Sequence, residues 1–144
     1  MTGAWRGVAV GALIAVIVAC GGQLNPRPNW DNPKENEITA LWTQIRDWRR
    51  EAHMDLEPTP QSLFSVRNAS APEVAKSCPD GHPVPPTCSD VCNLADAICD
   101  NAETICNLAD ELGKGDDYAQ QKCASGKASC REGKQRCCDC SGAP

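Results

Sequence analysis

The sequence predicts a small, disulfide-rich, all-α protein in which an antiparallel helical hairpin with a cysteine ladder follows one N-terminal amphipathic helix. Three observations predict this fold class. Ten of the eleven cysteines lie after residue 77 of the 144-residue chain, and two triplets of them repeat every seven residues. Aromatic side chains make up only 4% of the sequence, so a large apolar core is not expected. A domain with a small core usually needs covalent staples, which these cysteines can supply.

Residues 1–19 are predicted to be a signal peptide. Arg6 lies in a short basic region, and residues 7–19 form a 13-residue apolar run that is too short to span a bilayer comfortably. The run ends in Ile17-Val18-Ala19-Cys20, and two glycines follow it. The chain is therefore expected to be exported and processed near Cys20.

This segment resembles the lipobox of bacterial lipoproteins, in which the signal peptide is cleaved before the cysteine. The resemblance implies that Cys20 is lipidated, carries fatty acyl chains such as palmitate, and anchors the protein to the membrane of the cell envelope. Two or three chains give stable anchoring where one would not. Gly21 in place of an aspartate resembles the pattern of outer-membrane sorting, so the outer membrane is the expected location. The alternative is an ordinary cleaved signal peptide in which Cys20 has no special role.

Residues 20–36 are predicted to form the anchor cysteine and a flexible tether, because Pro26, Pro28 and Pro33 interrupt regular structure. Residues 37–77 are then predicted to form an amphipathic helix and an irregular linker. The helix is expected from Glu37 to Ala52, with Asn36 as its N-cap. After it, a short extended piece is expected at Leu63, Phe64 and Val66.

The predicted helix has one apolar stripe with helical spacing. The stripe consists of Ile38, Leu41, Trp42, Ile45 and Trp48. It could dock on a partner or on the membrane surface, or it could cover an apolar face of the same protein. We expect the second arrangement, because most amphipathic helices bury their stripe against their own core.

Residues 78–144 are predicted to form the hairpin, with arms from Ser89 to Leu112 and from Asp117 to Cys138. Because both triplets have the same spacing, pairing them from the outside inwards keeps one alignment of the arms. The pairs are Cys92 with Cys137, Cys99 with Cys130, and Cys106 with Cys123. Helix axes about 9–10 Å apart would place facing Cα atoms about 4.4–5.4 Å apart, within the disulfide range.

The positions between the cysteines support the same alignment, because they hold the smallest residues. The facing pairs are Ala95 with Gly133, Ala102 with Gly126, and Ala109 with Ala119. Glycine in a helix costs roughly 1 kcal/mol relative to alanine, and close approach of the arms would explain it. The same position extends the ladder to Cys88 with Cys140. Cys78 and Cys138 then pair by default, although the adjacent Cys137 and Cys138 could exchange roles.

A flanking position adds a weaker check on the alignment. The expected facing pairs there are Asp96 with Lys134, Glu103 with Lys127, and Asp110 with Gln120. Two of these three pairs have opposite charges. Exposed pairs typically contribute less than about 1 kcal/mol, but they help to fix the alignment of two helices.

The hairpin resembles other stapled helical hairpins, such as the twin cysteine-motif proteins of the mitochondrial intermembrane space and the plant α-hairpinins. The seven-residue cysteine spacing departs from the motifs of both families. The resemblance therefore implies architecture alone, and no functional residue carries over from it.

One aliphatic face of the first arm has no apolar counterpart on the second arm, which offers Lys122, Ser129 and Arg136 there. A face of this size needs a cover or a partner. If the first helix does not dock on it, it is the best site for an envelope protein partner. The partner-binding candidates are Val91, Leu94, Ile98, Ile105, Leu108 and Leu112, with Trp42 and Trp48 from the first helix.

The composition favours a structural or protein-binding module without catalysis. A net charge of −5 argues against nucleic acid as a partner. The two histidines, His53 and His82, have no predicted free thiol to pair with, and no phosphate-binding loop or serine elbow is present. We therefore predict no catalytic residue, no cofactor and no small-molecule substrate.

The alternative function is thiol-based binding of copper or zinc. Cys88 and Cys92, and the cluster at residues 137–140, offer sulfur ligands, with His82 nearby. Such sites need reduced thiols. An even number of cysteines remains when Cys20 is set aside, and in an exported protein this favours disulfides. No metal ligand is therefore predicted.

Overall fold

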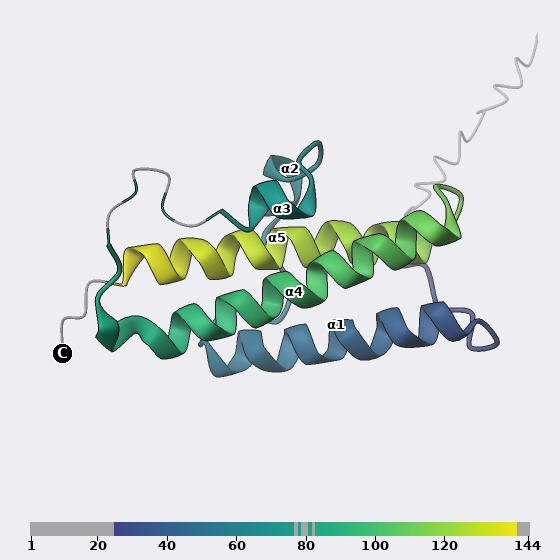
Figure 1. Cartoon of the computed structure of the whole chain (residues 1–144). Coiled ribbons are helices and arrows are strands. Elements are labelled where there is room, and N and C mark those ends of the chain that lie inside the picture. Colours follow the sequence, from purple (N-terminus) through teal and green to yellow (C-terminus); the bar gives the residue numbers. More distant parts are fainter. Residues whose placement is uncertain (1–24, 77, 79–80, 82, 141–144) are drawn as a thin grey trace, which may run out of the picture.

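A computed structural model describes residues 25–140 apart from 77, 79–80 and 82, and within these residues the protein is all-α, as predicted. The helices are α1 (Pro33–Glu51), α2 (Pro60–Ser65), α3 (Ala71–Val74), the 3₁₀ helix η1 (Pro86–Cys88), α4 (Ser89–Leu112) and α5 (Asp117–Asp139), shown in Figure 1. Among the described helices, none is both long and apolar enough to cross a bilayer. The predicted signal peptide and Cys20 lie outside the described residues.

α4 and α5 form the antiparallel hairpin, with bounds close to those predicted. Four disulfides join the pairs that the alignment of the two arms predicts, and a fifth joins Cys78 and Cys138, which were expected to pair by default. The bonds are Cys92–Cys137, Cys99–Cys130, Cys106–Cys123, Cys88–Cys140 and Cys78–Cys138. In the three central bonds the Cα atoms are 4.8, 4.6 and 4.6 Å apart. The two helix axes are therefore as close as the small residues between the cysteines allow.

The glycines of α5 lie where the two arms come closest. A Cβ atom added to Gly126 would lie 3.1 Å from Ala102 Cβ and 3.2 Å from Ala102 Cα. A Cβ atom added to Gly133 would lie 3.3 Å from both Ala95 Cα and Ala95 Cβ. The structure thus shows the close approach that the sequence suggested as the reason for these two glycines.

α1 lies along the hairpin, antiparallel to α4, and covers the aliphatic face. Lys34 Nζ lies 2.7 Å from Glu111 Oε2 near the turn, and Asn101 Nδ2 donates to Gln44 Oε1 at 3.0 Å further along. Ile38 and Ile45 of α1, and Ile98 and Ile105 of α4, are completely buried in the core between the helices. Burying such a side chain stabilises a fold by about 1.5–3 kcal/mol. The expectation that the first helix covers the hairpin is therefore confirmed.

α1 begins at Pro33, four residues before the predicted start at Glu37. Asn32, rather than Asn36, is the N-cap, and its Oδ1 accepts from Lys34 N at 3.1 Å. Proline suits the first position of a helix, because the backbone N–H that it lacks would have no partner there. Pro33 therefore starts the helix that it was expected to exclude.

The short extended piece predicted at Leu63, Phe64 and Val66 is also wrong, because residues 60–65 form the helix α2. Thr59 caps it by accepting from Ser62 N at 3.2 Å, and Pro60 again takes the first turn. α2 and α3 lie on the side of the hairpin away from α1 (Figure 1), and Val66 and Val74 join the core there.

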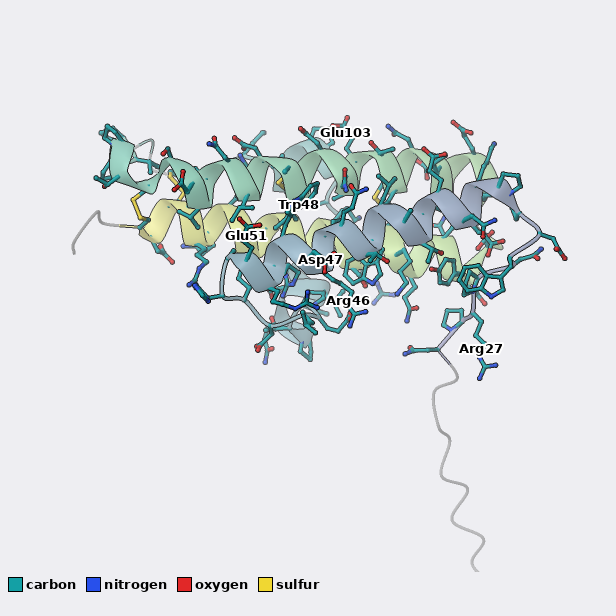
Figure 2. All side chains as sticks on the ribbon, turned by 90° about the horizontal axis from the view of Figure 1, so that it is seen from below. Arg27, Arg46, Asp47, Trp48, Glu51 and Glu103 are labelled. Atoms are coloured by element: carbon teal, nitrogen blue, oxygen red, sulfur yellow. A yellow bond between two sulfur atoms is a disulfide. The ribbon has the colours of Figure 1, made fainter. Side chains whose placement is uncertain are left out.

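One of the three predicted flanking pairs forms in the structure. Lys134 Nζ bonds Asp96 Oδ1, as expected. Lys127 Nζ instead donates to the carbonyl of Ala69 at 2.8 Å, because the segment before α3 passes over α5 at this point. Gln120 donates to the backbone carbonyl of Ala109 at 3.0 Å. Glu103 is exposed on the outer edge of α4 (Figure 2).

Candidate functional site

The predicted partner-binding face is largely internal. Ile98 and Ile105 are completely buried and Trp42 is 5% exposed, so these three side chains cannot meet another protein without displacing α1. Trp48, Leu108 and Leu112 are partly buried against the same core. This face was the expected partner site only if the first helix did not dock on it, and in the structure α1 covers most of it.

Lys122 of α5 lies over two aromatic side chains. Its Nζ lies 5.0 Å from the centre of the Trp42 ring and 5.6 Å from that of Tyr118. Burial lowers the pKa of Lys122, and Arg46 lowers it further, while Glu57 opposes both effects. Its aliphatic stem can cover the aromatic rings while the ammonium group keeps a favourable position over them.

The part of the face that α1 does not reach lies at the opposite end from the turn. α1 ends at Glu51, and Figure 1 shows it stopping before the end of the hairpin where α4 begins. Gln44 pairs with Asn101, so the antiparallel helices place Glu51 near the level of Leu94. Val91 lies about one turn further, and both Val91 and Leu94 are partly exposed.

A groove occupies this end of the molecule. One part has a volume of about 520 Å³, and an adjoining part of about 370 Å³ shares Arg136 and Asp139 with it. We call the two parts together the terminal groove. Its lining residues are Arg49, His53, Met54, Asp55, Ser62, Val91, Arg131, Glu132, Gln135, Arg136, Asp139 and Cys140.

Arg49 fixes the floor of the terminal groove. Its side chain is completely buried, with Nε donating to the carbonyl of Asp55 at 2.6 Å and Nη2 to that of Glu57 at 3.0 Å. Nη2 also donates to Glu132 Oε2 at 2.8 Å. Within the described residues, Nη1 is buried without a hydrogen-bond partner. One guanidinium group thus holds α1, the following loop and α5 together.

Glu132 completes this arrangement from α5. Its Oε1 accepts from Thr59 N at 2.9 Å and from Thr59 Oγ1 at 3.0 Å. Burial raises the pKa of Glu132, but hydrogen bonds from Ser62, Thr59 and Arg49 outweigh it and hold the pKa below its usual value. The Glu132 carboxylate therefore has a structural role, because donors of the protein itself bind both of its oxygen atoms.

His53 has an unusual backbone conformation at the edge of the groove. Its φ of 54° is in the left-handed region, where glycine or asparagine usually ends a helix. Its backbone N–H donates to Arg50 O, and Met54 N donates to Arg49 O, which closes the last turn of α1. The left-handed conformation of His53 therefore ends α1 and turns the chain into the loop that lines the groove.

The terminal groove presents both charged and apolar side chains. Arg131 and Arg136 are exposed beside the carboxylates of Asp55 and Asp139, and Val91 and Met54 add apolar surface. Asp139 accepts from Gln135 Nε2 at 2.8 Å. In the described part of the chain, no group of three or more His, Cys, Asp or Glu side chains could hold a metal ion. His82, which the metal-binding alternative placed near the sulfur ligands, lies outside the described residues.

Sequence reasoning missed this groove because its residues come from four separate segments. Val91 was identified as a partner-binding candidate, but Arg49, Arg131 and Met54 were not. The signal that could have indicated it is the length of the helices, since the first helix is shorter than the hairpin arms. Comparison with protein families, curated proteins and solved structures finds no match for this chain.

Proposed function

We propose that this protein is a lipid-anchored component of the cell envelope that acts as a protein-binding module without catalysing a reaction. The lipobox resemblance at Cys20 supports the anchor, and disulfides between all ten later cysteines are typical of an exported chain. The observation that carries the binding role is the terminal groove, where α1 leaves the end of the hairpin uncovered.

The terminal groove is suited to a protein segment because its walls are fixed before binding. The disulfides Cys92–Cys137 and Cys88–Cys140 hold α4 to α5 at this end, and Arg49 holds the loop after α1. A preorganised site loses less conformational entropy on binding. Arginine and methionine are also enriched at protein interfaces, and both line this groove. The expected ligand is a protein segment with one apolar side chain and polar groups around it.

The anchor is tested by replacing Cys20 with Ser. The variant should leave the membrane fraction for the soluble or secreted fraction, and metabolic labelling with a fatty acid should be lost. Unchanged fractionation of Cys20→Ser would contradict lipid anchoring, whatever the groove binds.

The binding role is tested with a photo-crosslinking amino acid in the native envelope. Gln135 is an exposed position in the groove, and Ala40 is an exposed position of α1 outside it, so Ala40 is the matched control. Position 135 should give one defined adduct with another protein, position 40 should not, and Val91→Glu should abolish that adduct. Equal adducts at both positions, or an adduct between two copies of this chain, would contradict the proposal.

A thiol count on the unreduced mature protein tests the alternative of thiol-based metal binding. In the structure, ten cysteines are oxidised, so they offer no thiolate to copper or zinc. The proposal expects almost no free thiol after residue 77. A count that includes most of the ladder cysteines would favour the metal-binding alternative.

A further inference from the structure

The segment that leads from the predicted anchor into α1 is held against the bundle from its first described residue. Gln121 Nε2 of α5 donates to Asn25 Oδ1 at 3.2 Å, and Pro26 and Pro28 are half-buried. Asn36 Nδ2 donates to the carbonyl of Trp30 at 2.9 Å, which fixes the turn before α1. Residues 25–32, which were expected to belong to a flexible tether, are therefore part of the folded unit, and residues 20–24 lie outside the described residues.

This attachment limits the distance between the anchor and the bundle. The inference rests on the proposed lipidation of Cys20. Five residue steps separate Cys20 from Asn25, and an extended chain spans at most about 3.6 Å for each step, or about 18 Å in total. α4 has 24 residues, so at 1.5 Å per residue the hairpin is about 36 Å long. Asn25 is bound near the turn, so the turn end must stay close to the membrane.

Trp30 lies on this same end and is exposed. Its side chain is 67% exposed, and among the described residues only Phe64 is another large exposed apolar side chain. Phe64 is on α2, whereas Trp30 lies in the segment that leads to the anchor. Tryptophan favours the headgroup level of a bilayer, where its ring is in an apolar region and its N–H remains hydrated.

The charges at the turn end indicate which lipid chemistry it meets. Arg27 extends from the start of the described chain (Figure 2), but Asp31 is also exposed nearby in the sequence. Lys34 is paired with Glu111, and Lys114 in the turn is followed by Asp116 and Asp117. Basic residues do not exceed acidic ones, so attraction to anionic lipid is not expected.

We propose that Trp30 inserts at the headgroup level of a zwitterionic phospholipid surface and holds the turn end of the bundle against the membrane. The terminal groove, at the opposite end of the hairpin, then faces away from that membrane. The partner of this surface is therefore lipid, and the groove remains accessible to a protein.

The test measures quenching of tryptophan fluorescence in vesicles of phosphatidylcholine that carry brominated acyl chains. The tryptophan fluorescence of the full mature, lipidated protein should be quenched. The Trp48→Phe variant should keep this quenching, and the Trp30→Phe variant should lose most of it. Trp48 is the matched control because it is partly buried in the core, remote from the turn. The Trp30-dependent quenching should not change between low and high salt. Equal quenching in wild type and Trp30→Phe would overturn the proposal.

A longer tether separates the contribution of Trp30 from that of the anchor alone. Twelve Gly and Ser residues inserted after Gly22 add roughly 20 Å of flexible reach. When both proteins carry this insertion, the fluorescence of the protein with Trp30 should still be quenched more than that of Trp30→Phe, because Trp30 itself binds the surface. Loss of that difference would overturn the role of Trp30. If the inserted protein does not float with vesicles at all, lipid anchoring fails instead, so the two failures are distinguishable.

Discussion

Arg49 of α1 and Glu132 of α5 form an ion pair, with Nη2 and Oε2 2.8 Å apart, and the arginine side chain is completely buried. The same two side chains bind the backbone of Asp55, Glu57 and Thr59. This single contact therefore connects the helix that covers the hairpin, the loop that follows it, and the hairpin itself. It also forms the floor of the terminal groove.

Replacing Arg49 with Ala should lower the free energy of unfolding by about 3 kcal/mol or more, because it leaves Glu132 without its cation and creates a cavity. The measurement is chemical denaturation of the oxidised protein. Arg50→Ala is the matched control, since Arg50 is exposed and its ion pair among the described residues is with Asp47 of the same helix. That control should cost less than about 0.5 kcal/mol. Equal losses in the two variants would show that the Arg49 contacts do not stabilise the fold.

The free energy of unfolding should decrease at acidic pH because the Glu132 carboxylate becomes protonated. Its pKa is held below the usual value of 4.5, so the folded protein binds fewer protons at this site than the unfolded chain. The resulting stabilisation is present above pH 4.5 and is lost as the pH falls through the lower pKa of the folded state. Thermal unfolding followed from pH 6 downwards should show a shallower decrease in Glu132→Gln. Glu103→Gln, on an exposed edge of α4, should retain the slope of the wild type, and identical slopes in all three proteins would refute this assignment.

Replacing Gly126 with Ala should destabilise the hairpin even though alanine is the better helix former. The added Cβ would lie 3.1 Å from Ala102 Cβ, and the neighbouring disulfides prevent the helices from moving apart. We expect a loss of about 1–3 kcal/mol from this overpacking. Ala102→Gly in the same protein should recover part of the loss, measured as a positive coupling in a double-mutant cycle. Additive effects would mean that the two residues are not in close contact.

Ser129→Ala should stabilise the protein. Ser129 is completely buried, and its Oγ has no hydrogen-bond partner within the described residues. Removing a buried, unsatisfied hydroxyl group should raise the free energy of unfolding by about 1 kcal/mol. Ser65→Ala is the control, because Ser65 is exposed and its Oγ donates to the carbonyl of Ser62 at 2.8 Å. A loss of stability in Ser129→Ala would imply that its hydroxyl group has a partner.

Removing the Cys78–Cys138 bond should leave the hairpin intact. The other four disulfides join α4, or Cys88 directly before it, to α5 or the adjoining Cys140, whereas Cys78 lies in the segment before η1. A variant with alanine at both positions should keep its helical circular dichroism and lose about 2–4 kcal/mol of stability. Peptide mapping should still find Cys92 linked to Cys137. A bond from Cys92 to any other cysteine in this variant would contradict an independent ladder.

The sequence by itself determined the hairpin. Its evidence is a repeat: cysteines every seven residues, with alanine or glycine between them, on two arms of matching length. Only one alignment places every cysteine of the repeat opposite another cysteine and every small residue opposite a small one. A disulfide and a close helix contact require specific side chains at specific positions. The spacing of cysteine, alanine and glycine in the sequence is therefore enough to predict the alignment of the two arms.

Tertiary structure decided where α1 begins, what covers the aliphatic face, and which end remains open. Pro33 and Pro60 permit a helix start or a tether equally well in sequence. In the structure each begins a helix that Asn32 or Thr59 caps, and Ile38 and Leu63 of these helices pack against the core. Lys127 could meet Glu103 or a carbonyl, and the path of the segment before α3 selects Ala69. The terminal groove and the docked segment 25–32 likewise depend on residues far apart in the chain. Their positions follow from packing of whole helices, which no local pattern encodes.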